Sequence, residues 1–160
     1  MSIEKVRAFM AGFGMEDKIL EFDVSSATVE LAAQAVGVEG KRIAKTLSFQ
    51  DGEGCMLIVM AGDARIDNSR FKAQFHFKAK MLPADVCAEM TGHAVGGVCP
   101  FAVPEAVKVY LDESLRRFET VFPACGSSNS AIELTCEKLQ ELAKPVAWID
   151  VCKGWREDEE

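Results

Sequence analysis

A glycine-rich stretch has the composition of a ligand-binding loop: Thr91-Gly92-His93-Ala94-Val95-Gly96-Gly97-Val98-Cys99-Pro100-Phe101. Gly96 and Gly97 have no Cβ, so the backbone can turn tightly there and a ligand can approach it closely. Backbone N–H groups in such a turn can bind a phosphate, a carboxylate or a developing oxyanion. Pro100 fixes its own φ and favours an extended Cys99. The stretch is therefore either an anion-binding loop or a connecting loop that needs glycines to turn.

A lysine far upstream occupies an unusual position. The segment Ile43-Ala44-Lys45-Thr46-Leu47-Ser48-Phe49 alternates with the period of a strand, and Lys45 shares its apolar face with Ile43 and Leu47. A lysine there must reach a sheet edge, bind an anion or lose its proton. Two interpretations stay open: a structural ion pair, or a functional lysine in a cleft.

The cysteines are scattered and form no C-x-x-C pair. With only His76 and His93 as additional ligands, no zinc-site spacing occurs, and we expect no metal and reduced thiols. Cys99 is a candidate nucleophile, because it lies in the glycine-rich loop, but it needs a histidine brought close by the fold. A redox or thiol protein that uses Cys99 or Cys125 is a further alternative. Neither a G-x-G-x-x-G motif nor a P-loop occurs, so no nucleotide cofactor is expected.

The elements that position these residues follow a mixed order. We expect one domain over residues 1–160, with strands and helices that do not alternate strictly, which favours an α+β fold. Helices are expected from residue 2, after one of the cap candidates Ser25, Ser26 and Thr28 as far as Gly37, after Asp67 or Asn68 to about residue 74, from Pro83 to residue 90 and after Thr135. Strands are expected at 18–23, 43–49, 55–60, 75–81, 107–111, 119–122, 132–134 and 145–151, and the wholly apolar 55–60 should be central.

Charge and hydropathy limit the possible partners. The net charge is −7, but residues 41–80 hold eight basic and four acidic side chains. That segment either guides a polyanion to one face or simply solvates the surface. No apolar run is long enough to cross a membrane and no signal peptide is apparent, so we expect a cytoplasmic protein without a membrane partner.

Five segments, taken in order, are similar to the YbaK/EbsC family, whose members are free-standing relatives of the editing domain of bacterial prolyl-tRNA synthetase. The resemblance extends from about the second expected helix to the last one, which is most of the chain. The segments are Ile43-Ala44-Lys45-Thr46-Leu47, Ala61-Gly62-Asp63-Ala64-Arg65-Ile66-Asp67, Thr91-Gly92 with Gly96-Gly97-Val98-Cys99-Pro100-Phe101, Leu111-Asp112-Glu113-Ser114-Leu115 and Ile132-Glu133-Leu134.

The resemblance implies an aminoacyl-tRNA deacylase that acts in trans on a mischarged small amino acid (Cys, Ala, Ser or Thr), typically on tRNA(Pro). It implies a mixed, partly barrel-like sheet flanked by helices. The family's lysine falls on Lys45 and its glycine-proline loop on Gly96, Gly97 and Pro100. Prolyl-tRNA synthetase is a further candidate partner, and the chain would act as a monomer or homodimer. The alternative is a non-catalytic module of the same fold that binds an aminoacyl or nucleotide end.

The resemblance implies catalytic roles for Lys45, Gly96 and Gly97. It implies that the substrate-binding residues are Thr46, His93, Val98, Cys99, Pro100, Gly126 and Ala131. Two departures from the family pattern fall among them. His93 replaces the usual aromatic residue after Thr-Gly, and Ala131 stands where an acidic residue commonly follows a G-K-R-G-like turn. Specificity for cysteine is therefore not implied, and another small amino acid is equally compatible.

Overall fold

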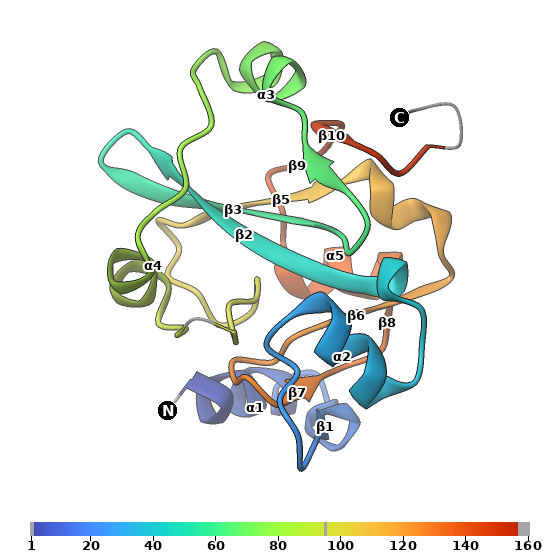
Figure 1. Ribbon diagram of the computed structural model, residues 1–160. Helices are drawn as coiled ribbons and strands as arrows, with labels where there is room; N and C mark the ends of the chain where they lie inside the picture. Colours follow the sequence, from blue (N-terminus) through green and yellow to red (C-terminus); the bar gives the residue numbers. More distant parts are fainter. Residues whose placement is uncertain (1, 95, 157–160) are drawn as a thin grey trace.

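The computed structural model describes residues 2–94 and 96–156, and a six-stranded mixed sheet lies at the centre of this part of the chain (Figure 1). The spatial order is β8-β6-β2-β3-β5-β9. The strands are β2 (Ile43–Asp51), β3 (Gly54–Ala61), β5 (Lys108–Asp112), β6 (Thr120–Pro123), β8 (Leu134–Thr135) and β9 (Ala147–Ile149). β2 is antiparallel to β3 and parallel to β6, while β3, β5 and β9 run parallel. Such a mixed sheet confirms the predicted fold class.

Two short strand pairs and several helices surround this sheet. β1 (Leu20–Glu21) pairs with β7 (Ser130–Ala131), and β4 (Arg65–Ile66) pairs with β10 (Cys152–Lys153). The helices are α1 (Ser2–Ala11), α2 (Val29–Val36), α3 (Asn68–Phe75), α4 (Ala84–Thr91) and α5 (Cys136–Ala143), with 3₁₀ turns η1 (Glu16–Lys18), η2 (Gly40–Arg42) and η3 (Glu113–Arg117). In Figure 1 the β2–β3 hairpin crosses the middle of the molecule, with α3 at one end and α1, β1 and β7 on the opposite side.

The predicted helix starts are confirmed by side-chain caps. Thr28 Oγ1 accepts a hydrogen bond from the N–H of Leu31 at 3.2 Å at the start of α2. Asp67 caps α3, and Thr135 caps α5 in the same way. Each cap satisfies a backbone donor that the first helical turn leaves unpaired. Gly37 then ends α2 in the left-handed conformation at φ 85°, as a glycine readily does.

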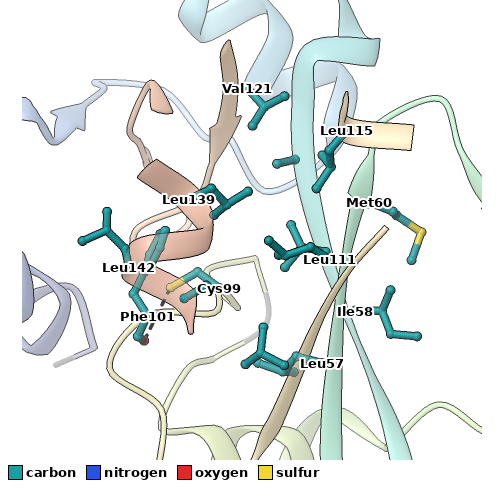
Figure 2. Close-up of a cluster of buried hydrophobic side chains, with 14 of the residues drawn as sticks. Leu57, Ile58, Met60, Cys99, Phe101, Leu111, Leu115, Val121, Leu139 and Leu142 are labelled. Carbon is teal, nitrogen blue, oxygen red and sulfur yellow. Dashed lines mark hydrogen bonds between the residues drawn. The ribbon is translucent and has the colours of Figure 1, made fainter. Parts of the chain in front are cut away.

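The core lies on both faces of β3, as its continuous apolar sequence predicts. Residues 55–61 are all buried. Figure 2 shows Leu139 of α5 on the side of Leu57 and Leu111, while Ile58 projects from the other side of β3. No side chain of a strand that is covered on both faces points to solvent, so its sequence is an uninterrupted apolar run.

A buried carboxylate fixes the ends of β3 and β5. Asp112 is fully buried and accepts hydrogen bonds from the N–H groups of Ser114 at 2.9 Å and Val151 at 3.0 Å. Ser114 Oγ in turn accepts from the N–H of Ala61 at 3.1 Å. This network satisfies backbone donors where the strands end, so the Leu111–Leu115 segment has a structural role.

One predicted strand is wrong, and three others are shorter than expected. Residues 75–81 contain the end of α3 and an irregular segment with a single bridge, between Phe49 and Met81. Phe75 and Phe77 both pack on Phe71, with ring centroids 4.7 and 5.9 Å away, so burial of these rings produced the apparent alternation. The strands predicted over 18–23 and 145–151 are limited to β1 (Leu20–Glu21) and β9 (Ala147–Ile149), and of the strand predicted over 132–134 only Leu134 lies in a strand.

Candidate functional site

A cavity of about 480 Å³ lies beside β2 and collects residues from distant parts of the chain. Of the predicted site residues, Lys45, Thr46, Gly96, Val98 and Ala131 line it. The rest of the lining is mostly apolar and consists of Ser26, Ala27, Thr28, Val29, Ala32, Ile43, Ala44, Leu47, Ser48, Met81, Leu82, Ala84, Cys87, Phe122, Ala124 and Ser130. The fold therefore brings β2, the glycine-rich loop and the segment after β6 to one hollow.

The cavity occupies a gap along one edge of β2. On that edge β6 pairs only with Ile43 and Ala44, and further on Ser48 O accepts from the N–H of Leu82 at 3.3 Å. Between these contacts, within the described chain, the edge has no neighbouring strand. Backbone groups of alternate residues face the same edge, so Thr46, like Ala44 and Ser48, directs its N–H and C=O away from β3 and into the gap.

Lys45 lies at the cavity, half-buried. Its Nζ donates to the carbonyl of Gly62 at 3.3 Å, and no carboxylate among residues 2–94 and 96–156 lies within 4 Å of it. Burial lowers the pKa of Lys45 from its usual value, while the charges of Asp63 and Glu30 oppose this effect. The structure thus does not contain the ion pair that was one interpretation, and it leaves a cation available beside an apolar hollow.

The two central glycines are required by close packing. Gly96 has φ +88°, and a Cβ there would lie 3.0 Å from Ala27 Cβ. A Cβ on Gly97 would lie 2.6 Å from backbone atoms of Gly126 and Ser127. The N–H of Gly97 is already used, because it donates to Ala94 O at 3.0 Å. Gly97 therefore positions the loop against a neighbouring turn and has no free donor for an oxyanion, contrary to the expectation for this residue.

His93, Cys99 and Pro100 lie in the protein interior and do not line the cavity. Nε2 of His93 lies 2.7 Å from Phe101 O and 3.6 Å from Cys99 Sγ. Figure 2 shows Cys99 and Phe101 beside Leu142 of α5, inside the core. These contacts close the glycine-rich loop on itself, so in this conformation the three residues support the loop and do not touch a ligand.

The environment of Cys99 also opposes a nucleophilic role. Burial raises the pKa of the Cys99 thiol to about 12, and burial lowers the pKa of His93. A neutral thiol beside a neutral imidazole lacks the thiolate character that reactive cysteines have. Burial likewise raises the pKa values of Cys55, Cys125, Cys136 and Cys152. The thiol-based interpretation therefore has no support in this geometry.

The turn after β6 forms the opposite wall of the cavity. Gly126 adopts φ 90° and lies under Gly97, outside the lining, whereas Ala131 lines the cavity and pairs with Leu20. The hydroxyl of Ser127 donates to Ser130 Oγ at 2.8 Å, which holds the turn closed. The small Ala131 leaves space where an acidic side chain would intrude.

Several lining residues were not anticipated from the sequence. The sequence predicts only a possible helix cap at Ser26 and the end of a strand at Met81, and it predicts no role for Leu82. No local pattern marks them, because they reach the cavity through contacts over large sequence separations. The N–H of Ser26, for example, donates to Ser128 O at 2.6 Å.

Three of the eight basic side chains in segment 41–80 form ion pairs with described acidic residues. Arg42 forms an ion pair with Glu133, Arg70 with Asp150 and Lys41 with Glu39. In the described residues no cluster of His, Cys, Asp or Glu suits a metal ion, and no described helix is long and apolar enough to cross a membrane. Lys45 is thus the basic residue of this segment that lines the cavity.

Comparison with known proteins agrees with this arrangement. A family model described as the aminoacyl-tRNA editing domain matches residues 23–142. The protein YwhH of Bacillus subtilis (strain 168), itself described as uncharacterized, is 53% identical over 156 residues, covering 97% of this chain and 99% of YwhH.

Two solved structures have a similar fold. A proposed trans-editing enzyme for prolyl-tRNA synthetase is 28% identical, with a TM-score of 0.85 and coverage of 96% of this chain and 98% of that chain. The hypothetical protein APE2540 is 27% identical, with a TM-score of 0.77 and coverage of 89% and 99%. The family match spans β2, the glycine-rich loop and α5, and the chain belongs to the aminoacyl-tRNA editing domain family, the YbaK-like family that its motifs resemble.

Proposed function

We propose that this protein is a deacylase that hydrolyses, in trans, the ester of a small non-cognate amino acid (Cys, Ala, Ser or Thr) on tRNA. The observation that carries the proposal is Lys45, an unpaired and half-buried cation in the wall of a mostly apolar cavity. Membership of the editing-domain family and similarity to a proposed trans-editing enzyme for prolyl-tRNA synthetase support it. tRNA(Pro) is accordingly the first tRNA to test.

The size and lining of the cavity suit this substrate. About 480 Å³ lies within the usual range of small-ligand sites. The lining includes Ala27, Ala44 and Ala131. Their small side chains leave room for a small amino acid in the cavity. An apolar pocket distinguishes similar amino acids only weakly by size, so polar contacts must supply further selectivity.

The available groups suit ester hydrolysis assisted by electrostatics. A negative charge develops on the carbonyl oxygen in the transition state, and stabilising it is commonly the largest contribution to catalysis. Lys45 can provide that charge stabilisation or bind the terminal phosphate. The N–H of Thr46 on the free edge of β2 is a second candidate donor, and it takes the role first expected of Gly97.

The attacking group need not come from the protein. No described residue that lines the cavity is His, Asp or Glu, and we give Lys45, its only described lysine, the role of a cation and not of a base. Nucleophilic side chains generally need such a base or a strongly lowered pKa. We therefore assign the attack to water or to a hydroxyl of the substrate itself.

The test is deacylation of tRNA(Pro) charged with alanine, cysteine, serine, threonine or proline. The wild type is expected to hydrolyse one or two non-cognate esters and to spare the proline ester. Lys45→Ala should lower kcat/KM by about 100-fold or more, as removal of one oxyanion-stabilising group does elsewhere. Lys41→Ala is the matched control, because this neighbouring lysine pairs with Glu39 and does not line the cavity.

Two results would contradict the proposal. Full activity of Lys45→Ala would remove Lys45 from the mechanism. Binding of charged tRNA without hydrolysis of any ester would instead establish the binding-module alternative. Circular dichroism of each variant shows that the fold is retained.

A further inference from the structure

Three exposed lysines lie on the stretch of chain that leads from α3 to the cavity. They are Lys72 in α3, and Lys78 and Lys80 in the irregular segment between α3 and α4. None of them has a carboxylate oxygen within 4 Å of its Nζ in the described residues. No Asp or Glu occurs between Asp67 and Asp85, although the whole chain carries a net charge of −7. This stretch is therefore a local excess of positive charge on an acidic protein.

Hydrogen bonding and packing hold the segment 76–83 along β2. The N–H of Gln50 donates to Lys80 O at 2.8 Å. The half-buried Ala79 packs against the core between the exposed Lys78 and Lys80. Such alternation is that of an extended chain, so both lysine side chains are directed to solvent. Figure 1 shows the segment leaving α3, crossing the β2–β3 hairpin and reaching α4.

The segment leads directly into the cavity wall. Met81 and Leu82 line the cavity, and Lys80 precedes them in the chain. Two residues of an extended chain span about 7 Å, a spacing comparable to that of successive phosphates in a nucleic-acid strand. Lys78 and Lys80 are two residues apart, and Lys72 lies farther from the cavity along the chain, in the last turn of α3. The three charges thus form a series that begins beside the cavity and continues toward α3.

We propose that Lys80, Lys78 and Lys72 bind successive backbone phosphates of the single-stranded 3′ end of tRNA, while the aminoacyl ester occupies the cavity. This inference rests on the proposed deacylase function, and it names the surface that receives the tRNA. The phosphate that precedes the terminal nucleoside lies at Lys80, and the strand then follows the segment 76–83 toward α3. Lysine suits this role, because it binds a phosphate as a point charge and requires no fixed geometry.

Two apolar side chains beside the lysines favour a single strand over a duplex. Phe77 is 37% exposed and Met81 is 55% exposed. The ring of Phe77 packs edge-on against Phe71, with centroids 5.9 Å apart, so it is held in place at the surface. Proteins that bind single-stranded nucleic acids combine a basic groove with side chains on which unpaired bases stack. A duplex buries its base faces, so these exposed groups fit the 3′ end of tRNA better than its acceptor stem.

The ion-paired basic side chains of segment 41–80 are less available to RNA. Lys41, Arg42 and Arg70 each contact a carboxylate, which a phosphate would have to displace. The three unpaired lysines exchange only small counterions when they bind a phosphate, and release of counterions from the nucleic acid makes such binding depend on salt. For single strands, each phosphate contact contributes about 0.7 to the slope of log K against log salt, so three contacts contribute about 2.

The test is binding of uncharged tRNA(Pro), measured by fluorescence anisotropy at several salt concentrations. The triple variant Lys72→Gln/Lys78→Gln/Lys80→Gln should bind about 10-fold or more weakly than wild type in about 0.1 M salt, and its salt slope should be smaller by about 2. Each single variant should lower the slope by about 0.7. A tRNA(Pro) without its single-stranded 3′ end should bind equally to wild type and to the triple variant.

Lys18→Gln is the matched control for each single variant. Lys18 is exposed and has no carboxylate oxygen within 4 Å among the described residues. It ends η1, next to β1, on the opposite side of the molecule from α3 (Figure 1). Its substitution removes the same charge and should leave the affinity and the salt slope at their wild-type values.

Hydrolysis distinguishes this surface from the cavity. On aminoacylated tRNA the triple variant should raise KM by about 10-fold or more at nearly constant kcat, and its kcat/KM on an aminoacyl ester of adenosine, which has no phosphate, should equal that of wild type. Lysine-dependent tRNA binding without hydrolysis of any ester would support the surface and disprove the deacylase. Unchanged tRNA affinity in the triple variant would overturn the proposal, as would an equal loss of affinity for tRNA without its 3′ end or an equal loss in Lys18→Gln.

Discussion

Gly97→Ala tests the contact that holds the glycine-rich loop against the turn at Gly126. The new Cβ would lie 2.6 Å from Gly126 C and from Ser127 N, whereas ordinary contact begins at 3.4 Å, so the two segments must separate by roughly 0.8 Å. Both neighbours are backbone atoms and cannot rotate away. Since the φ of Gly97 is not in the left-handed region, the expected cost is steric only.

Overpacking of this kind destabilises proteins by about 1–3 kcal/mol. For a chain of this size each kcal/mol lowers the melting temperature by about 2–4 °C. A loss of that size leaves a domain of ordinary stability mostly folded at 25 °C. We nevertheless expect kcat/KM at 25 °C to fall by about 10-fold or more, because misplacement of catalytic groups by 1 Å can cost about 100-fold.

The assays are urea unfolding and deacylation kinetics on the same preparations. Gly54→Ala is the matched control, because its Cβ would lie 3.4 Å from the nearest atom, Asp51 O, and it should stay within about 1 kcal/mol of wild type. Wild-type stability and activity in Gly97→Ala would refute the close packing inferred for the loop. Lower stability with unchanged kcat/KM would show that the loop does not shape the cavity.

Two further predictions concern charge and thiol chemistry. Because burial lowers the pKa of Lys45, activity that needs its ammonium should decline, as pH rises, at a lower pH than an ordinary lysine would give. A kcat/KM profile corrected for spontaneous hydrolysis measures this, and Lys45→Arg should move the decline to higher pH. Lys45→Met should be as stable as wild type or more so in urea at neutral pH, where the buried charge is disfavoured. This advantage should decline as the pH rises through the lowered pKa of folded Lys45 and be absent above the pKa of an unfolded lysine. Cys99→Ala should retain kcat/KM within about threefold, because its thiol is buried and protonated, and a complete loss in a folded variant would restore the thiol mechanism.

The elements of the fold were largely predictable, because local patterns encode them. Thr28, Asp67 and Thr135 each cap the helix that their sequence positions predict. Residues 55–60, apolar throughout, form the central strand. The strand predicted over 75–81 was wrong, because Phe75 and Phe77 alternate in order to pack on Phe71. An alternating pattern of aromatic residues is the same in this irregular segment as in a strand.

The candidate site was predictable only where chemistry conflicts with local structure. Lys45 stood out because a lysine on an apolar strand face needs a reason, and the structure places it at the cavity. His93 and Cys99 were expected at the same site from their place in the loop, yet they lie behind the cavity wall. Sequence proximity to a glycine turn does not specify which side of the loop faces a ligand.

By itself the sequence determined the mixed strand and helix order, the central strand, the conspicuous lysine and the resemblance to the editing family. These depend on residue type and short-range spacing, which are fully present in a linear chain. Only the tertiary structure decided that β6 leaves the edge of β2 after Ala44 and that this opens a cavity at Thr46. It also decided that Ser26, far away in the sequence, lines that cavity. Strand register and contacts between distant segments arise from packing of the whole chain, so no local pattern can specify them.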